Sequence, residues 1–92
     1  MLNNTQYRNL ELIIKGFANH RRLQILNLLE KSPGLSVDGI TENLSIGYEN
    51  ASDHIRKMHL AGLVTKHSVG NNVIHRLTLR AKSILVFCKK LK

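Results

Sequence analysis

The chain has 92 residues, a net charge of +8 and a single cysteine. This length suits one domain with a small core, one cysteine excludes an internal disulfide, and no apolar run approaches the roughly 20 residues that span a bilayer. The first residues lack the apolar region of a signal peptide, so the expected location is the reducing cytoplasm, with no membrane partner.

Charge is unevenly distributed along the chain. Every acidic residue lies at or before Asp53, whereas most of the lysines and arginines follow it. Solvation alone would explain any one of these basic residues. A basic half-chain, however, is typical of proteins that bind a polyanion. We therefore expect a nucleic-acid partner.

Two helices are expected in the first third of the chain. Asn4 or Thr5 can cap a first helix over about residues 4–18. Apolar residues recur at helical spacing on one face of it, at Tyr7, Leu10, Ile14 and Phe17. Asn19 can cap a second helix, which is apolar around most of its girth and is therefore predicted to be central. Ser32-Pro33-Gly34 ends it.

A short helix, a turn and a longer helix follow. Ser36 can cap the short helix, and its inward residues are predicted to be Val37, Ile40 and Leu44. After the turn at Ser45-Ile46-Gly47 comes the longer helix, which ends at Gly62. The helical spacing of its apolar residues predicts that three of them face inward, namely Ala51, Ile55 and Met58. The side left to solvent holds Glu49, Asn50, Ser52, Asp53, Arg56 and Lys57.

The pattern then changes to alternating apolar and polar residues, which predicts a β-hairpin. Its strands are expected over 63–69 and 73–78, around the positive-φ turn Gly70-Asn71-Asn72. Residues 79–92 are predicted to form a last helix whose apolar stripe is Ile84, Phe87, Cys88 and Leu91. The predicted fold is mainly α with a small β-hairpin (α+β): one winged helix-turn-helix domain over 1–92, with five helices and a two-stranded wing.

Three segments resemble the ArsR family of small winged-helix repressors. Phe17-Ala18-Asn19-His20-Arg21-Arg22-Leu23-Gln24-Ile25-Leu26 looks like the family's ALADPTRLRIL. Ala51-Ser52-Asp53-His54-Ile55 is similar to VSRHL, and Leu60-Ala61-Gly62-Leu63-Val64 to REAGLV. The likeness covers about residues 14–79. It implies a homodimer built on the first and last helices, with the fourth helix in the major groove and the wing beside it.

The resemblance and the helical period indicate the same DNA-facing helix. Asn50 could pair with adenine, and Arg56 with guanine or phosphate. On the wing, Lys66 and Arg76 could hold the DNA backbone, beside an uncharged tip at Asn71-Asn72. The full predicted set is Tyr48, Glu49, Asn50, Ser52, Asp53, Arg56, Lys57, Lys66, Asn71, Asn72 and Arg76.

Two acids on the fourth helix depart from the family's pattern. Glu49 and Asp53 lie one turn apart, so they repel each other and also repel phosphate. Lys57, one turn after Asp53, could neutralise that charge, and a carboxylate can accept a hydrogen bond from a cytosine amino group. The same acids favour an alternative function, a winged-helix protein–protein interaction module with little specific DNA binding.

The two terminal helices supply the expected dimer interface. Its predicted residues are Tyr7, Leu10, Ile14, Phe17, Ile84, Phe87, Cys88 and Leu91. Cys88 is interpreted as a small apolar residue of this stripe. The alternative is a thiol at the dimer interface that senses oxidation, which requires exposure and a lowered pKa.

No metal and no cofactor are expected. Many ArsR proteins sense metals through a Cys-x-Cys pair before the turn, but Ser36-Val37-Asp38 stands at the matching positions. The last helix also lacks the Asp, His and Glu of the family's other metal site. The histidines are scattered, although His67 and His75 lie on opposing predicted strands and could meet. Zinc needs three or four ligands.

These observations predict a sequence-specific regulator that binds double-stranded DNA, acts as a repressor and functions as a homodimer. An enzyme is not expected, because no P-loop, glycine fingerprint or Ser-His-Asp ordering is present. RNA binding is a weaker alternative, since aromatic stacking residues are scarce. Membrane binding by the basic last helix is weaker still. The operator, the effector and the regulated genes are left open.

Overall fold

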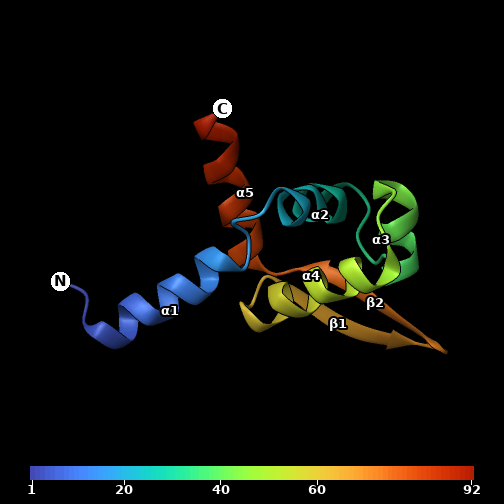
Figure 1. Ribbon diagram of the computed structural model, residues 1–92, viewed down its shortest axis with the longest axis horizontal. Helices are drawn as coiled ribbons and strands as arrows, with labels where there is room; N and C mark the ends of the chain where they lie inside the picture. The colour runs from blue at the N-terminus through green and yellow to red at the C-terminus, as the bar shows by residue number, and fades with distance from the viewer.

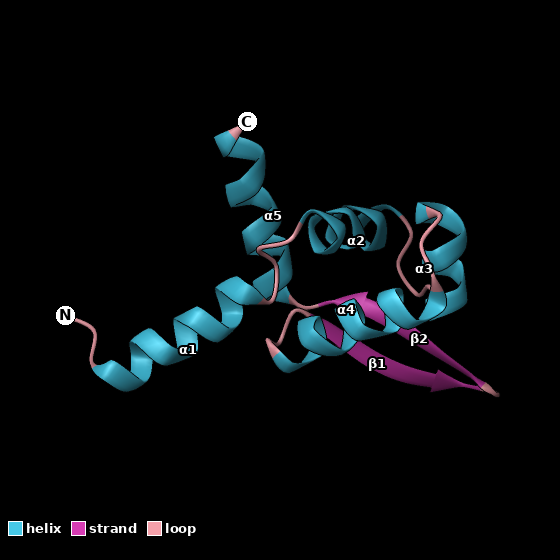
Figure 2. Ribbon diagram, in the orientation of Figure 1, coloured by secondary structure: helices cyan, strands magenta, loops and turns pink.

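A computed structural model describes residues 1–92. The elements, in chain order, are α1 (Asn4–Lys15), α2 (His20–Lys31), α3 (Val37–Leu44), α4 (Tyr48–Leu60), β1 (Val64–Val69), β2 (Asn72–Leu77) and α5 (Leu79–Leu91). In Figure 1, α2, α3 and α4 gather around the hairpin, whereas α1 and α5 project from this body. The structure contains the five helices and the single hairpin that the sequence predicts. Figure 2 distinguishes the helices from the strands by colour.

Side-chain caps fix where the first three helices begin. Asn3, not Asn4 or Thr5, caps α1: its side chain accepts from the Gln6 backbone N–H at 2.9 Å, and the Gln6 side chain accepts from the Asn3 N–H at 2.8 Å. Only a cap three residues before Gln6 completes this reciprocal pair. The other two predicted caps are confirmed. Asn19 accepts from the Arg21 N–H at 2.9 Å, and Ser36 accepts from the Gly39 N–H at 3.2 Å.

Helix α1 ends at Lys15, so the prediction that it continues to residue 18 is wrong. Gly16 lies against Ala61 so closely that an added Cβ would come within 2.4 Å of the Ala61 Cβ. The chain turns at this contact, and Phe17 packs, half-buried, against the core of its own chain. No residue of α1 is itself buried. The helix is therefore held at its C-terminal end and exposed over the rest of its length.

The core forms around α2, as the sequence predicts. This helix contacts α3, α4, α5 and β2. The residues predicted to face inward from α4 are all buried, and from α3 Ile40 is buried while its predicted neighbours are half-buried. The core side chains are Ile25, Leu26, Leu29, Ile40, Ala51, Ile55, Met58, Ala61, Leu63, Val64, Ala81 and Leu85.

The hairpin pairs Val64 with Leu77 at one end and Val69 with Asn72 at the other. The strands are therefore slightly shorter than predicted at Leu63 and Thr78, and Asn72 belongs to β2 rather than to the turn. Gly70 has φ +61°, which suits the two-residue connection. Leu35, before α3, bridges to His75 and adds a short third edge to the wing.

His75 is buried, with 1% of its surface exposed. Its Nδ1 lies 2.9 Å from the Leu35 carbonyl oxygen, which also accepts the His75 backbone N–H. His67 pairs with Ile74 and lies 2.8 Å from the Thr65 hydroxyl. Because successive side chains alternate between the two faces of a hairpin, His67 and His75 project from opposite faces. The prediction that they could meet is wrong.

Acid is expected to destabilise the fold through His75. Burial lowers its pKa below the ordinary 6.5, more than the Leu35 carbonyl raises it, and Lys66 and His59 lower it further. The unfolded chain then binds a proton at a pH where the folded chain does not. The stability contributed by neutral His75 is complete above about pH 6.5 and is lost as the pH falls below it. One proton sets the upper limit of this slope at about 1.4 kcal/mol per pH unit.

Urea unfolding at a series of pH values between 7.5 and 5 measures this loss. His75→Gln should give a smaller pH dependence, and His67→Gln, which replaces an exposed histidine, should retain that of the parent. An unchanged pH dependence in His75→Gln would contradict the assignment.

Candidate nucleic-acid interface

Helix α4 presents the predicted polar face to solvent. Three buried residues hold it on the core, namely Ala51, Ile55 and Met58. They fix the orientation of the helix, because residues three and four apart share one side. On the other side Tyr48, Glu49, Asn50, Arg56 and Lys57 are exposed, and Ser52 and Asp53 are half-exposed. The predicted residues of this helix therefore lie where a large ligand could reach them.

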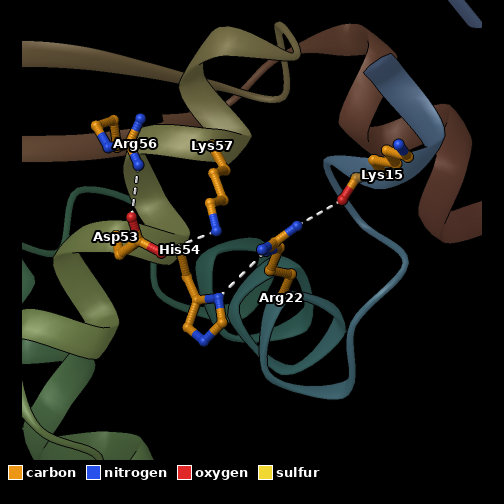
Figure 3. A network of polar contacts seen from close by, with 6 residues as sticks. All are labelled: Lys15, Arg22, Asp53, His54, Arg56 and Lys57. Atoms are coloured by element: carbon orange, nitrogen blue, oxygen red, sulfur yellow. Dashed lines mark hydrogen bonds and ion pairs between the residues drawn. The ribbon is translucent and has the colours of Figure 1, made fainter. Parts of the chain in front are cut away.

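Asp53 holds both basic residues of this face (Figure 3). One carboxylate oxygen lies 2.6 Å from Arg56 Nη2, and the other lies 3.0 Å from Lys57 Nζ. Hydrogen bonds from Arg56 and then Lys57 hold the pKa of Asp53 below its usual 3.8. The predicted neutralisation by Lys57 is confirmed. The pairing with Arg56 was missed, although the i, i+3 spacing on one helix could have revealed it.

Glu49 differs from Asp53 because it has no ionic partner. The other ion pairs of the chain join Lys15 to Glu11 and Lys89 to Glu30. Glu49 lies in the first turn of α4, where the helix dipole favours a negative charge. The two acids therefore affect a nearby phosphate differently: Glu49 acts as a bare charge, whereas Asp53 acts as the centre of an ion-pair cluster.

Arg22, which lies on α2, connects this helix to α4 and to the end of α1 (Figure 3). Its Nε donates to His54 Nδ1 at 3.1 Å, and its Nη1 donates to the Lys15 carbonyl oxygen at 2.5 Å. Burial lowers the pKa of His54, and the positive charge of Arg22 lowers it further. The negative charge of Asp53 raises this pKa, whereas Lys57 and His20 lower it. A neutral His54 is the form that can accept from Arg22.

The start of α4, the start of α3 and the wing tip meet around one pocket of about 250 Å³. Tyr48, Asn71 and Asn72, all predicted to face DNA, line it together. The remaining lining residues are Ser36, Val37, Asp38 and Val73. Sequence reasoning did not assign Ser36 and Asp38 to this surface, because their nearness to the wing tip depends on the tertiary fold.

The two basic residues of the wing point in different directions. Lys66 pairs with His75, and Thr65 pairs with Arg76. Neighbouring pairs alternate between faces, so Lys66 and Arg76 project from opposite faces of the hairpin. Arg76 borders a pocket with Glu30 and Lys82, on the side of α2 and α5. One DNA backbone at one wing face would therefore meet only one of the two.

No three His, Cys, Asp or Glu side chains lie close enough together to hold a metal ion. Cys88 is half-buried on α5. None of the helices has both the length and the apolar character needed to cross a bilayer.

The family model for the arsR family of bacterial regulatory proteins matches residues 19–66, just over half of the chain. The chain belongs to the ArsR family. This confirms the resemblance seen in the sequence. The ArsR family and this fold are those of DNA-binding transcription regulators rather than of enzymes.

Solved structures share the whole architecture of this ArsR-family protein. The homodimeric winged helix-turn-helix DNA-binding domain Mb0332 from Mycobacterium bovis has a TM-score of 0.86 and 21% identity, over 99% of this chain and 87% of that one. HlyU from Vibrio cholerae N16961 has a TM-score of 0.82 and 26% identity, over 97% of each chain. The transcriptional repressor PagR of Bacillus anthracis has a TM-score of 0.81 and 21% identity, over 94% of this chain and 99% of that one. No curated protein sequence matches the chain.

Proposed function

We propose that this ArsR-family protein is a repressor that binds a specific double-stranded DNA operator as a homodimer. The observation that carries the proposal is the exposed polar face of α4, which three buried residues anchor on the core. Such a helix fits the major groove, where each base pair presents its own pattern of donors and acceptors. Bacterial DNA lies in the cytoplasm, so the proposed function implies that location.

The terminal helices support the homodimer. Helix α1 buries no residue in the single chain, and it exposes Tyr7, Leu10 and Ile14. Helix α5 exposes Phe87 and Leu91. Adjacent exposed apolar side chains mark an interaction surface, and the similar Mb0332 domain is described as homodimeric. Phe17 and Ile84 pack partly against the core of their own chain, so we assign them a smaller share of the interface. Cys88 is half-buried, and we assign it an intermediate share.

We assign the DNA contacts in three groups. Asn50 and Ser52 face base edges, with Arg56 facing a base or a nearby phosphate. Lys57 and Lys66 bind the backbone, and Arg76 does so only if DNA approaches its own face of the wing. Tyr48, Asn71 and Asn72 border the DNA at the pocket between α4 and the wing tip.

Recovering genomic fragments bound by the purified protein tests the function. We expect one enriched palindromic site, because a two-fold dimer reads two half-sites. Asn50→Ala should cost about 1–3 kcal/mol at one operator position, whereas Lys66→Ala should weaken binding to all sequences alike and reduce the salt slope by about one.

The second candidate is the protein-interaction module, which the unpaired Glu49 on the same face favours. If Asn50→Ala and Arg56→Ala both leave duplex binding unchanged across a salt titration, α4 is not the DNA reader. The protein-interaction function would then be the better account of this face.

A further inference from the structure

A pocket of about 190 Å³ opens where the end of α1, the start of α2 and the end of α4 meet. Its walls are Leu12, Lys15, Gly16, Arg22, Lys57 and Leu60. Every charged residue among them is basic. The two leucines are 53% and 62% exposed, which is high for side chains of this size. The pocket therefore combines positive charge with uncovered apolar surface.

Arg22 lacks an acidic partner although it is half-buried. One of its N–H groups donates to the Lys15 carbonyl oxygen, and another donates to His54 Nδ1 (Figure 3). A guanidinium has five N–H donors, so the others are available. A partly desolvated charge is unfavourable until an opposite charge meets it. Lys15 and Lys57 already have acidic partners in the chain, Glu11 and Asp53. Arg22 is therefore the one basic residue of this pocket whose counter-ion would come from outside the chain.

The proposed dimer leaves this pocket open. At 3.6 residues per turn, Leu12 projects from the side of α1 opposite to the stripe formed by Tyr7, Leu10 and Ile14. A partner helix seated on that stripe does not cover Leu12. A small molecule could therefore enter and leave while the dimer persists.

We propose that this pocket binds a small organic carboxylate with an apolar body, and that such a ligand is the effector of the regulator. The carboxylate would take the free N–H donors of Arg22 in a forked arrangement, and the apolar body would lie between Leu12 and Leu60. An apolar cavity of about 150 Å³ holds a benzene ring. The available volume therefore accommodates a ring or a short branched chain.

Lys57 would transmit binding to the DNA-facing side. Its side chain lines the pocket and also pairs with Asp53 on α4. A carboxylate in the pocket competes for the same ammonium group and draws it away from phosphate. The ligand should therefore weaken DNA binding. This regulatory part depends on the proposed DNA-binding function, whereas the binding of the ligand does not.

Sodium benzoate is a suitable probe, and two-dimensional NMR of the full chain without DNA is a suitable readout. We expect saturable shifts at the pocket residues and an increase in the apparent pKa of His54, because a bound anion offsets the charge of Arg22. Benzyl alcohol lacks the charge and sodium sulfate lacks the apolar body. Neither should reproduce the saturable shifts.

Arg22→Gln should weaken benzoate binding more than tenfold. Arg21→Gln is the matched control, because it removes the same charge at the neighbouring position, where the guanidinium binds Gln24 instead. Leu60→Ser alters an exposed side chain, so it should fold normally and still weaken binding. Equal shifts with sulfate, or equal losses in both arginine variants, would overturn the proposal. If the parent protein binds benzoate but does not bind duplex DNA, only the proposed function is overturned.

Discussion

Phe87→Asp is expected to convert the proposed dimer into a folded monomer of 10.4 kDa. The Phe87 side chain is 56% exposed in the single chain, so its replacement leaves the core intact. A two-fold interface buries two copies of it. Full burial of a phenylalanine contributes about 1.5–3 kcal/mol, and about half of this is gained here because the side chain is already partly covered in the single chain. The dimer dissociation constant should therefore rise at least about tenfold. Sedimentation at micromolar concentration measures the change.

Val86→Asp is the matched control, since Val86 is 54% exposed on the same helix but lies off the proposed stripe. It should remain a dimer. Ile84 is a poor choice for this test, because it packs against the core and its replacement would also destabilise the monomer. If the parent protein sediments only as a monomer, or if both aspartate variants dissociate equally, the terminal helices do not form the interface.

Asp53→Asn is expected to tighten nonspecific duplex binding about tenfold at 0.1 M salt. The change removes a charge that repels phosphate and releases Arg56 and Lys57 from their ion pairs. One additional phosphate contact steepens the dependence of log affinity on log salt by about 0.9, which accounts for a factor of this size. Fluorescence anisotropy with unrelated duplexes over a salt series tests it.

Glu49→Gln is the control for Asp53→Asn, because it removes the same charge but releases no basic residue. Its effect should be smaller. Comparison at the specific operator shows what else Asp53 does. If it accepts from a cytosine amino group, the variant should also lose preference at one base pair. Weaker binding of Asp53→Asn to every duplex would contradict the expectation that Asp53 keeps Arg56 and Lys57 from phosphate. It would mean that Asp53 holds Arg56 in the position from which it contacts DNA.

The sequence by itself determined features that depend on neighbours along the chain. Caps at Asn19 and Ser36 and the helix end at Gly62 follow from local hydrogen bonding and positive φ. The inward face of α4 follows from its period. At the first helix Asn3, Asn4 and Thr5 are all competent caps, and the choice was missed because it depends on the reciprocal bond with Gln6.

Only the tertiary structure decided which distant groups meet. Arg22 and His54 are 32 positions apart, and neither residue type indicates the other. Hairpin register separated His67 from His75 and put Lys66 and Arg76 on opposite faces. The contact of Gly16 with Ala61 stopped α1 early and turned Phe17 toward the core. A local pattern specifies how a segment folds and which side is apolar. The partner of that side is set by how all the segments pack together, because the same apolar surface can be buried against several others.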